Sequence, residues 1–150
     1  MLTTGVNSSC GVNCPCPALM SLYNPLAKNG TLFSERIGCN ETIVCTVKEE
    51  TMIIASWNGS EIAHPPDAVG PNFAIRAEDT KAAPYAEKNL FDVFGIECDN
   101  GSWYATKYPI GVSLGGSQMY NLNRNRSKII GFECYVPFNQ DIVDNLLLRR

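Results

Sequence analysis

The chain has 150 residues, of which 45% are apolar and 18% are charged, and its formal net charge at pH 7 is -3. This balance is typical of one folded domain with a hydrophobic core and excludes a disordered chain. The small negative charge and the absence of a dense lysine or arginine run exclude an electrostatic surface for nucleic acid or anionic membrane. No apolar run is long enough for a transmembrane helix, so we expect no membrane insertion.

The N-terminal part of the sequence begins without a regular element. Residues 1–13 lack the basic flank and continuous apolar stretch of a signal peptide. We therefore expect either a chain without its leader or a protein that stays inside the cell. Residues 10–17, CGVNCPCP, form a cysteine-rich entry, and residues 18–38 are turn-rich. We treat 1–13 as an N-terminal segment and expect the domain to span 14–136.

Two β-rich runs follow this entry. TIVCTV (42–47) alternates, with Ile43 and Cys45 on one face, and TMIIASW (51–57) is the second run. The short polar link between them predicts that the two runs pair as a hairpin.

The middle of the chain is predicted to be a long loop followed by two strands. Residues 60–90 contain four prolines and are expected to form a surface loop with one helical turn at 82–88. FDVFGIEC (91–98) and WYATKYPIGV (103–112) are predicted strands. Asn100-Gly101 lies between them and favours a two-residue hairpin turn, because both residues tolerate positive φ.

The last predicted strand covers residues 128–136. Alternation places four of its residues on one face: Ile130, Phe132, Cys134 and Val136. The strand shares the pattern Gly-X-Glu-Cys with residues 95–98, so we expect both strands to send cysteine inward and glutamate outward. Residues 111–127 are expected to be loop. The tail 137–150 has apolar residues at helical spacing, which predicts a short helix or a stub leading to another domain.

These elements predict a mostly β chain with long loops and little helix. The expected fold class is a disulfide-stabilised antiparallel β-sandwich, immunoglobulin-like in outline. The outline rests on Cys45, Trp57 and Cys98, which follow the cysteine–tryptophan–cysteine order of such sandwiches. It is a loose likeness, since Ile96 stands where immunoglobulin domains carry a tyrosine.

The cysteines carry the most specific chemical signal. There are seven: Cys10, Cys14, Cys16, Cys39, Cys45, Cys98 and Cys134. Close neighbours such as Cys14 and Cys16 rarely bridge each other, so each is expected to find a distant partner. Six can pair and one is left over, and sequence alone does not fix the connectivity.

Metal binding is the alternative use of these thiols. A zinc site takes four thiolate or imidazole ligands, usually from close pairs, here Cys14 with Cys16 and Cys39 with Cys45. The second pair is a loose fit. The only histidine, His64, precedes two prolines and is more typical of a solvated loop residue. We therefore favour disulfides and expect no metal and no cofactor.

Potential N-glycosylation sites are unusually frequent. Asn-X-Ser/Thr occurs at Asn7, Asn29, Asn40, Asn58, Asn100 and Asn125. The residue frequencies predict roughly 1.7 such tripeptides by chance. Clustering of asparagine and serine in turns is the alternative explanation. Glycosylation and disulfides together indicate an extracellular location, either secreted or on the cell surface.

The order of the motifs resembles the nematode six-cysteine extracellular domain family, much of which has no known function. The resemblance covers about residues 14–134 and rests on TIVCTV, IECDNGSWYAT and KIIGFEC. It implies that the first and third cysteines pair, here Cys14 with Cys39. Cys45 with Cys98 and Cys16 with Cys134 are then working pairings. Cys10 departs from the family pattern and is expected to be unpaired, although it or Cys14 could take the first position.

Three functions are compatible with these observations. The first is an extracellular interaction or structural module with an unknown extracellular protein or glycan as partner. Trp103, Tyr104 and Tyr108 are candidate contact residues, unless they face the core. The second is an intracellular metal-binding protein. The third is a small carbohydrate-active protein, for which a pair of carboxylates is needed. The candidates are Glu49, Glu50, Glu97, Asp99 and Glu133.

The sequence offers no catalytic residue that we would assign. His64 has no nucleophile beside it, and no Gly-X-Ser-X-Gly elbow occurs. Gly115-Gly116-Ser117 lacks the lysine of a phosphate-binding loop and is expected to be a flexible loop. We therefore expect a protein that is not an enzyme.

Overall fold

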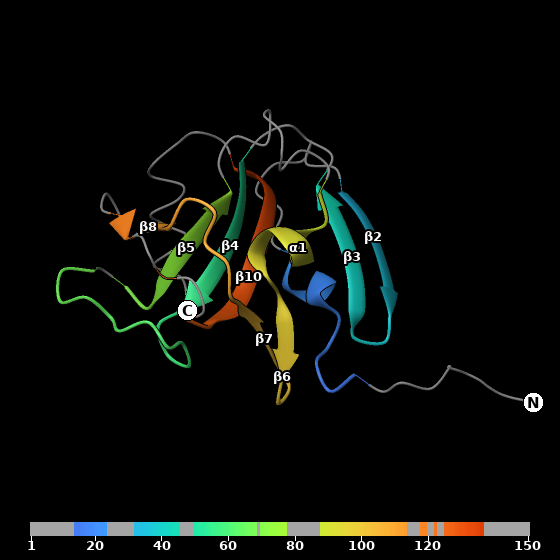
Figure 1. Cartoon of the computed structure of the whole chain (residues 1–150), viewed down its shortest axis with the longest axis horizontal. Helices are drawn as coiled ribbons and strands as arrows, with labels where there is room; N and C mark the ends of the chain where they lie inside the picture. Colours follow the sequence, from blue (N-terminus) through green and yellow to red (C-terminus); the bar gives the residue numbers. More distant parts are fainter. Residues whose placement is uncertain are drawn as a thin grey trace, which may run out of the picture.

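Strands dominate the architecture of the chain (Figure 1). The computed structural model describes residues 14–23, 32–45, 50–68, 70–77, 88–113, 118–119, 122 and 125–136. Its elements in chain order are the 3-10 helix η1 (Leu19–Leu22), β2 (Leu32–Ile37), β3 (Asn40–Cys45), β4 (Glu50–Ser56), β5 (Asn72–Ala77), α1 (Leu90–Phe94), β6 (Glu97–Asp99), β7 (Ser102–Ala105), β8 (Val112–Ser113), β9 (Gln118–Met119) and β10 (Ser127–Val136).

The described strands form two antiparallel sheets. The larger has the order β6-β7-β10-β4-β5-β8-β9, and the smaller is the hairpin β2-β3. Figure 1 shows the hairpin beside the large sheet, with α1 between β10 and β3. Three disulfides link these parts. The predicted fold class, mostly β and antiparallel with disulfides and little helix, is confirmed.

The hydrophobic core lies between one face of the large sheet and a layer made of η1, β3 and α1. Strand β4 is central, and its residues Met52, Ile53, Ile54 and Ala55 are all buried. Ile53 and Ala55 belong to the same core cluster as Ile43 of β3. A strand buried on both faces reads as a continuous apolar run, which is the pattern of this segment.

The predicted hairpin between 42–47 and 51–57 is wrong. β3 pairs instead with β2, from Leu32 opposite Cys45 to Ile37 opposite Asn40. β4 pairs with β10 on one side and β5 on the other. The reason is that a fully buried strand needs neighbours on both edges to satisfy its backbone groups. Gly38 lies in the β2–β3 turn with φ 62°, a conformation that glycine adopts easily. The strand before this turn was not predicted, because residues 32–37 include several polar residues.

The expected loop 60–90 contains strand β5. In Asn72–Ala77 every residue but one is buried, so this short strand lacks the apolar–polar alternation that signals a half-buried strand. The loop 111–127 likewise contains β8 and β9. The predicted helical turn at 82–88, apart from Lys88, and the predicted tail 137–150 lie outside the described residues, as does the segment 1–13.

The predicted strand 91–98 is half helix. Asn89 caps α1 by accepting a hydrogen bond from the Phe91 N–H, and Gly95 ends the helix in the left-handed region at φ 56°. Strand β6 begins only at Glu97, and the strand predicted at 103–112 breaks after Ala105. The Asn100-Gly101 turn is confirmed, because both residues have positive φ and the turn joins β6 to β7.

Strand β10 contains a bulge that changes which side chains face the core. The register with β4 skips Ile130, so Ile129 joins Phe132 and Cys134 in the core and Ile130 is exposed. The expectation that Glu133 points outward is also wrong, because this carboxylate side chain is buried in the middle of the sheet. Glu97, its counterpart on β6, is exposed as expected.

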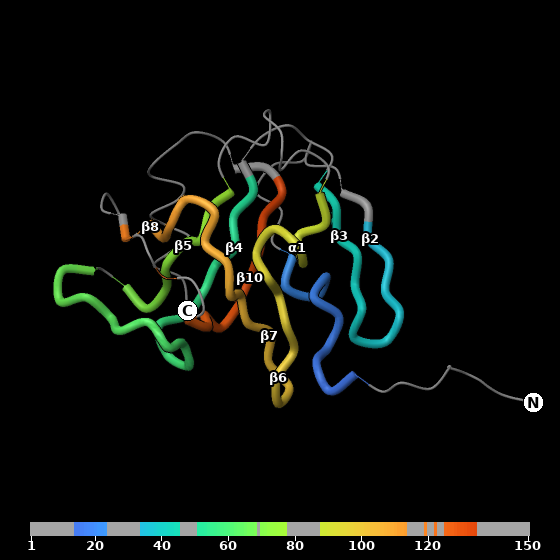
Figure 2. Tube along the Cα trace, in the orientation of Figure 1, coloured from blue at the N-terminus to red at the C-terminus, as the bar shows by residue number. Residues whose placement is uncertain are grey.

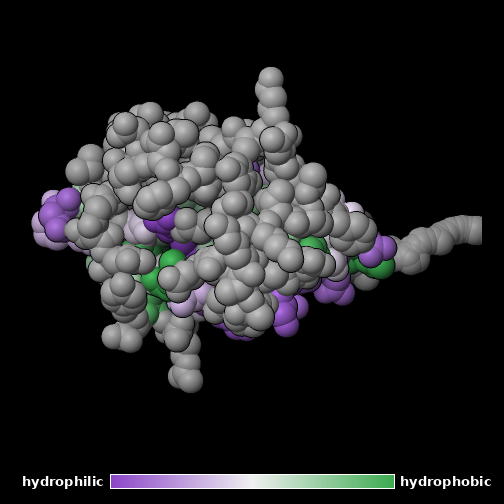
Figure 3. Space-filling view, turned by 90° about the horizontal axis from the view of Figure 1, so that it is seen from above, coloured by the Kyte–Doolittle hydropathy of each residue, from purple (hydrophilic) through white to green (hydrophobic). Residues whose placement is uncertain are grey.

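Exposed apolar side chains are few among the described residues. Two large ones are exposed, Ile37 and Ile130. In the view from above, small areas of described hydrophobic and hydrophilic residues are visible between the residues drawn in grey (Figure 3). No helix in the described ranges has the length and hydropathy needed to cross a membrane.

Candidate functional site at the N-terminal strap

The N-terminal strap, residues 14–23, connects the two sheets. The tube in Figure 2 runs between the β2–β3 hairpin and the β6–β7 hairpin in this stretch. Cys14 is bonded to Cys39 of the β2–β3 turn, with 5.0 Å between Cα atoms. Cys16 is bonded to Cys98 of β6, with 6.0 Å between Cα atoms. The strap therefore holds the hairpin and the edge of the large sheet together.

The third disulfide crosses the core. Cys45 of β3 is bonded to Cys134 of β10, with 5.2 Å between Cα atoms, and both residues are buried. The structure thus has the Cys14–Cys39 pair that the family resemblance implied. The working pairings Cys45–Cys98 and Cys16–Cys134 are wrong, because β3 packs over the centre of the sheet near β10, whereas β6 lies at its edge.

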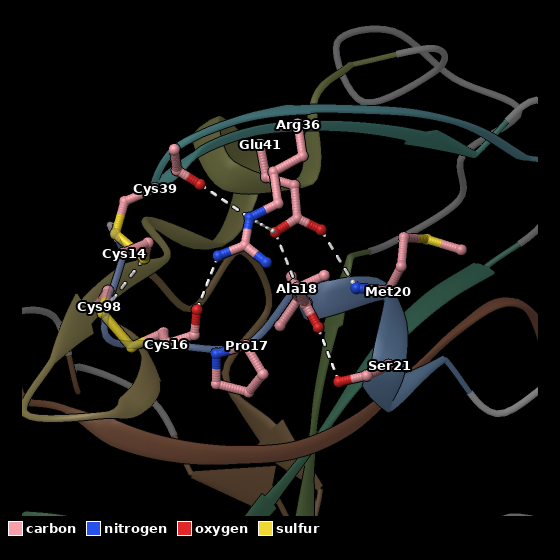
Figure 4. Close-up of polar contacts among 12 residues, drawn as sticks. Cys14, Cys16, Pro17, Ala18, Met20, Ser21, Arg36, Cys39, Glu41 and Cys98 are labelled. Atoms are coloured by element: carbon pink, nitrogen blue, oxygen red, sulfur yellow. Dashed lines mark hydrogen bonds and ion pairs between the residues drawn. A yellow bond between two sulfur atoms is a disulfide. The ribbon is translucent and has the colours of Figure 1, made fainter. Parts of the chain in front are cut away.

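Four sulfur atoms gather where the strap starts (Figure 4). Cys14 Sγ lies 3.9 Å from Cys98 Sγ, so the two disulfides of the strap are in contact. The Sγ atoms of Cys14, Cys39 and Cys98 lie within 4.8 Å of one another. Cys45, a ligand only in the metal alternative, lies elsewhere in its own disulfide. Cys10 lies outside the described residues.

Glu41 of β3 fixes the other end of the strap. Its carboxylate accepts hydrogen bonds from the backbone N–H groups of Leu19, at 2.9 Å, and Met20, at 3.1 Å. The side chain is 1% exposed. Sequence analysis missed this residue, although continuing the alternation of Ile43 and Cys45 two residues back places Glu41 on the same inward face.

Arg36 of β2 completes the polar network in Figure 4. Its guanidinium donates to the carbonyl oxygens of Cys16 and Gly38, each at 2.7 Å. Its Nε lies 4.0 Å from the Glu41 carboxylate, which partly balances its charge. Arg36 therefore joins the strap to the β2–β3 turn on the side of the disulfides. Arg36 lies opposite Glu41 in the β2–β3 hairpin, so a correct prediction of this hairpin would have paired the two opposite charges.

Two aromatic residues pack the strap onto the large sheet. The Trp103 indole N–H donates to the carbonyl oxygen of Pro17 at 2.7 Å. Tyr23 packs its ring 5.1 Å from that of Phe132. Burial raises the pKa of Tyr23, and the negative charge of Glu133 raises this pKa further.

The predicted contact aromatics are not a free surface. Trp103 and Tyr108 are buried. Tyr104 is half-buried, and the guanidinium of Arg126 lies 4.2 Å from the centre of its ring. Arg126 also pairs with Asp99 at 2.6 Å and with Glu61 at 3.5 Å. This arrangement stabilises the fold and leaves Tyr104 covered.

The sequon asparagines that the structure describes are all exposed: Asn40, Asn58, Asn100 and Asn125. They lie at element ends: at the β2–β3 turn, after β4, in the β6–β7 turn and before β10. All of these ends point to the lower side of Figure 1. Asn7 and Asn29 lie outside the described residues.

The carboxylates and His64 are not gathered into one site. Glu97 is exposed on β6, Asp99 is paired with Arg126 and Glu133 is buried in the sheet. Glu49, the side chain of Glu50 and Gly115-Gly116-Ser117 lie outside the described residues. His64 packs its ring 4.9 Å from that of Trp57, with its nitrogens 2.8 Å and 3.2 Å from carbonyl oxygens of its own loop.

Comparison with known proteins identifies a family. The family described as TRA-1 regulated protein R03H10.4 matches residues 12–134. No curated protein and no solved structure matches the chain significantly. The expected relationship to a nematode family of unknown function is confirmed at this level, whereas the six-cysteine extracellular assignment stays a prediction.

Proposed function

The chain belongs to the family described as TRA-1 regulated protein R03H10.4, and from this premise we propose that it is an extracellular, disulfide-rich and N-glycosylated module. It is secreted or forms part of the ectodomain of a surface protein. It acts by binding an extracellular protein or glycan, or as a structural unit, and not as an enzyme.

The observation that carries this proposal is the use of six cysteines in three disulfides. Each disulfide joins parts of the chain that belong to different elements, so the folded state depends on oxidation. Disulfides of this kind persist in oxidising compartments and are rare in the reducing cytosol.

The exposed sequon asparagines support the same location. A glycan is bulky and needs a surface position, which Asn40, Asn58, Asn100 and Asn125 all have. Their common end of the molecule is therefore the proposed glycan-bearing end (Figure 1).

A second candidate is an intracellular protein whose thiols bind metal. It is favoured by the close approach of the Cys14, Cys39 and Cys98 sulfur atoms. Zinc binds thiolates and not disulfides, so the two functions require opposite oxidation states of the same residues. The carbohydrate-active alternative has no such support, because Glu133 is buried and Asp99 is paired with Arg126.

Intact mass of the protein made behind an added secretion signal tests the proposal. We expect glycan mass that a peptide N-glycosidase removes, three disulfides, and one cysteine, Cys10, that is alkylated without reduction. Asn100→Gln and Ser102→Ala each destroy the same sequon, so each is expected to lose the same glycan mass.

An unglycosylated protein with all seven cysteines open to alkylation contradicts this proposal. If that protein also carries stoichiometric zinc, the metal-binding function replaces it.

A further inference from the structure

Two of the three disulfides touch each other at the start of the strap. Cys14–Cys39 and Cys16–Cys98 approach to 3.9 Å between the sulfur atoms of Cys14 and Cys98. We propose that these two disulfides form one thiol–disulfide exchange site for a small monothiol such as glutathione. The inference rests on the oxidised state in the proposed function.

Burial separates three of the four cysteines of this pair from the third disulfide, whereas Cys16 is itself buried. Cys14, Cys39 and Cys98 are half-buried, so each of these residues is partly open to solvent. Cys45 is 6% exposed and Cys134 is fully buried. Because exchange requires access of a thiolate to a disulfide sulfur, the reaction begins at the strap and not in the core.

The exchange has two steps, and each forms one bond and breaks one. In the first, the thiolate of the monothiol attacks Cys39 Sγ, forms a mixed disulfide there and releases Cys14 as a thiolate. In the second, Cys14 attacks Cys98 Sγ, so Cys14–Cys98 forms while Cys16–Cys98 breaks. Cys16 leaves as a thiolate and takes a proton from water. One monothiol is bound, and the number of disulfide bonds is unchanged when the mixed disulfide on Cys39 is counted.

The surroundings of Cys16 stabilise its thiol form once the released sulfur has taken up a proton. Its Sγ lies 3.3 Å from the carbonyl oxygen of Ser102, which accepts a hydrogen bond from an S–H group at that position. Arg36 donates to the Cys16 carbonyl and to that of Gly38, next to Cys39. Arg36 therefore holds the backbone on both sides of the two disulfides.

The outcome is a change of linkage between elements. Before exchange the strap is bonded to both the β2–β3 turn and β6. Afterwards it is bonded to β6 alone through Cys14, and Cys39 carries the monothiol. The site therefore uncouples the hairpin turn from the strap and makes Cys39 a covalent attachment point.

Paired variants test the step between the two disulfides. Cys39→Ser and Cys14→Ser, each combined with Cys10→Ser, break the same disulfide but leave a different thiol beside Cys16–Cys98. The proteins are held at about pH 8, near the ordinary pKa of a cysteine thiol. Because Cys16 is buried in the folded chain, they are then unfolded and alkylated at acidic pH without reduction, and mapped by mass spectrometry. We expect about tenfold more alkylated Cys16 in the Cys39→Ser variant, because Cys14 is the sulfur in contact with Cys98. Equal or absent alkylation overturns the proposal.

Treatment of the Cys10→Ser protein with glutathione gives a second readout. This protein still has all three disulfides when the treatment begins. The expected products are glutathione on Cys39, a Cys14–Cys98 bond and alkylated Cys16. Glutathione on an otherwise intact Cys16–Cys98 bond overturns the exchange site and leaves the proposed function standing. A protein whose cysteines all alkylate before treatment contradicts the proposed function itself, and the exchange site with it.

Discussion

Glu41 shows how one side chain can anchor a segment without regular structure. Its two oxygens accept from two consecutive backbone N–H groups of the strap, in a position closed to water. A carboxylate accepts on both oxygens, whereas an amide accepts on one and presents an N–H₂ group to the other donor. The charge of Glu41 is therefore needed for the strap as well as for Arg36.

We expect Glu41→Gln to lower the free energy of unfolding by about 1–3 kcal/mol, because a buried backbone N–H loses its acceptor. Urea unfolding followed by circular dichroism measures this loss. Glu35→Gln is the matched control, since Glu35 is exposed on the neighbouring strand and its loss is expected to stay within about 0.5 kcal/mol. Equal effects of the two substitutions would contradict the anchoring role.

Tyr108 links stability to alkaline pH. Its hydroxyl donates to the carbonyl oxygen of Asn125 at 2.5 Å and lies 2.7 Å from Ser127 Oγ. Burial raises the pKa of Tyr108, a change that the Ser127 hydrogen bond opposes and the charge of Glu61 reinforces. With the pKa raised in the folded state, the contribution is complete below the ordinary pKa of about 10 and is lost as pH rises beyond it.

Tyr108→Phe is expected to cost about 1–3 kcal/mol at neutral pH, because the Asn125 carbonyl and the buried Ser127 hydroxyl lose a partner. The fall in stability above about pH 10 should become shallower in the variant. Urea unfolding across the alkaline range measures both effects. Tyr104→Phe, which removes a hydroxyl from a half-buried ring and keeps that ring under Arg126, is the control at neutral pH and should cost less.

At the scale of elements, α1 and β3 are joined through Asn89, whose backbone forms an antiparallel bridge with Val44 and whose side chain adds further hydrogen bonds. Asn89 Oδ1 accepts from the N–H of Phe91 at 3.2 Å and from that of Ile43 at 3.0 Å. Its Nδ2 donates to the carbonyl oxygen of Glu41 at 3.4 Å. Asn89 therefore both caps α1 and hydrogen-bonds to the edge of β3 in the hairpin.

Asn89→Ala should lower the stability by about 2–3 kcal/mol, the sum of a lost helix cap and an unsatisfied N–H on β3. Asn89→Asp keeps both accepted hydrogen bonds and is expected to lose less. Thermal unfolding ranks the variants, and hydrogen exchange at the Ile43 amide locates the effect. An Ile43 amide that stays equally protected in Asn89→Ala would show that the bond to β3 contributes nothing.

The sequence predicts strands where the residues alternate or form a continuous apolar run, and fails where neither pattern is present. The runs 42–47, 51–57 and 128–136 correspond to β3, β4 and β10. β5 has no alternation, and α1 has only five residues, so neither gives a periodic signal of useful length. Pairing partners are decided by contacts distant in the sequence, which explains the wrong hairpin.

At the scale of the whole molecule, the disulfides hold the small sheet against the large one, which strand pairing does not do. The described hairpin and the large sheet share no strand ladder, so the disulfides of the strap and Cys45–Cys134 link them in addition to the chain itself. The cysteines could be identified from the sequence as disulfide partners. Their pairing could not, because it depends on β3 lying over β10, an arrangement that local sequence patterns do not encode.

The length of chain that each disulfide closes predicts its contribution to stability. The separation is 25 residues for Cys14–Cys39 and 89 residues for Cys45–Cys134. On the chain-entropy model these loops correspond to roughly 3.5 and roughly 4.5 kcal/mol. Replacement of both cysteines by alanine should therefore destabilise more at Cys45–Cys134, where the lost packing of two buried sulfur atoms adds to the difference. Guanidinium unfolding of the two double variants checks the order, and a larger loss at Cys14–Cys39 would mean that the strap, and not the link across the core, holds the two sheets together.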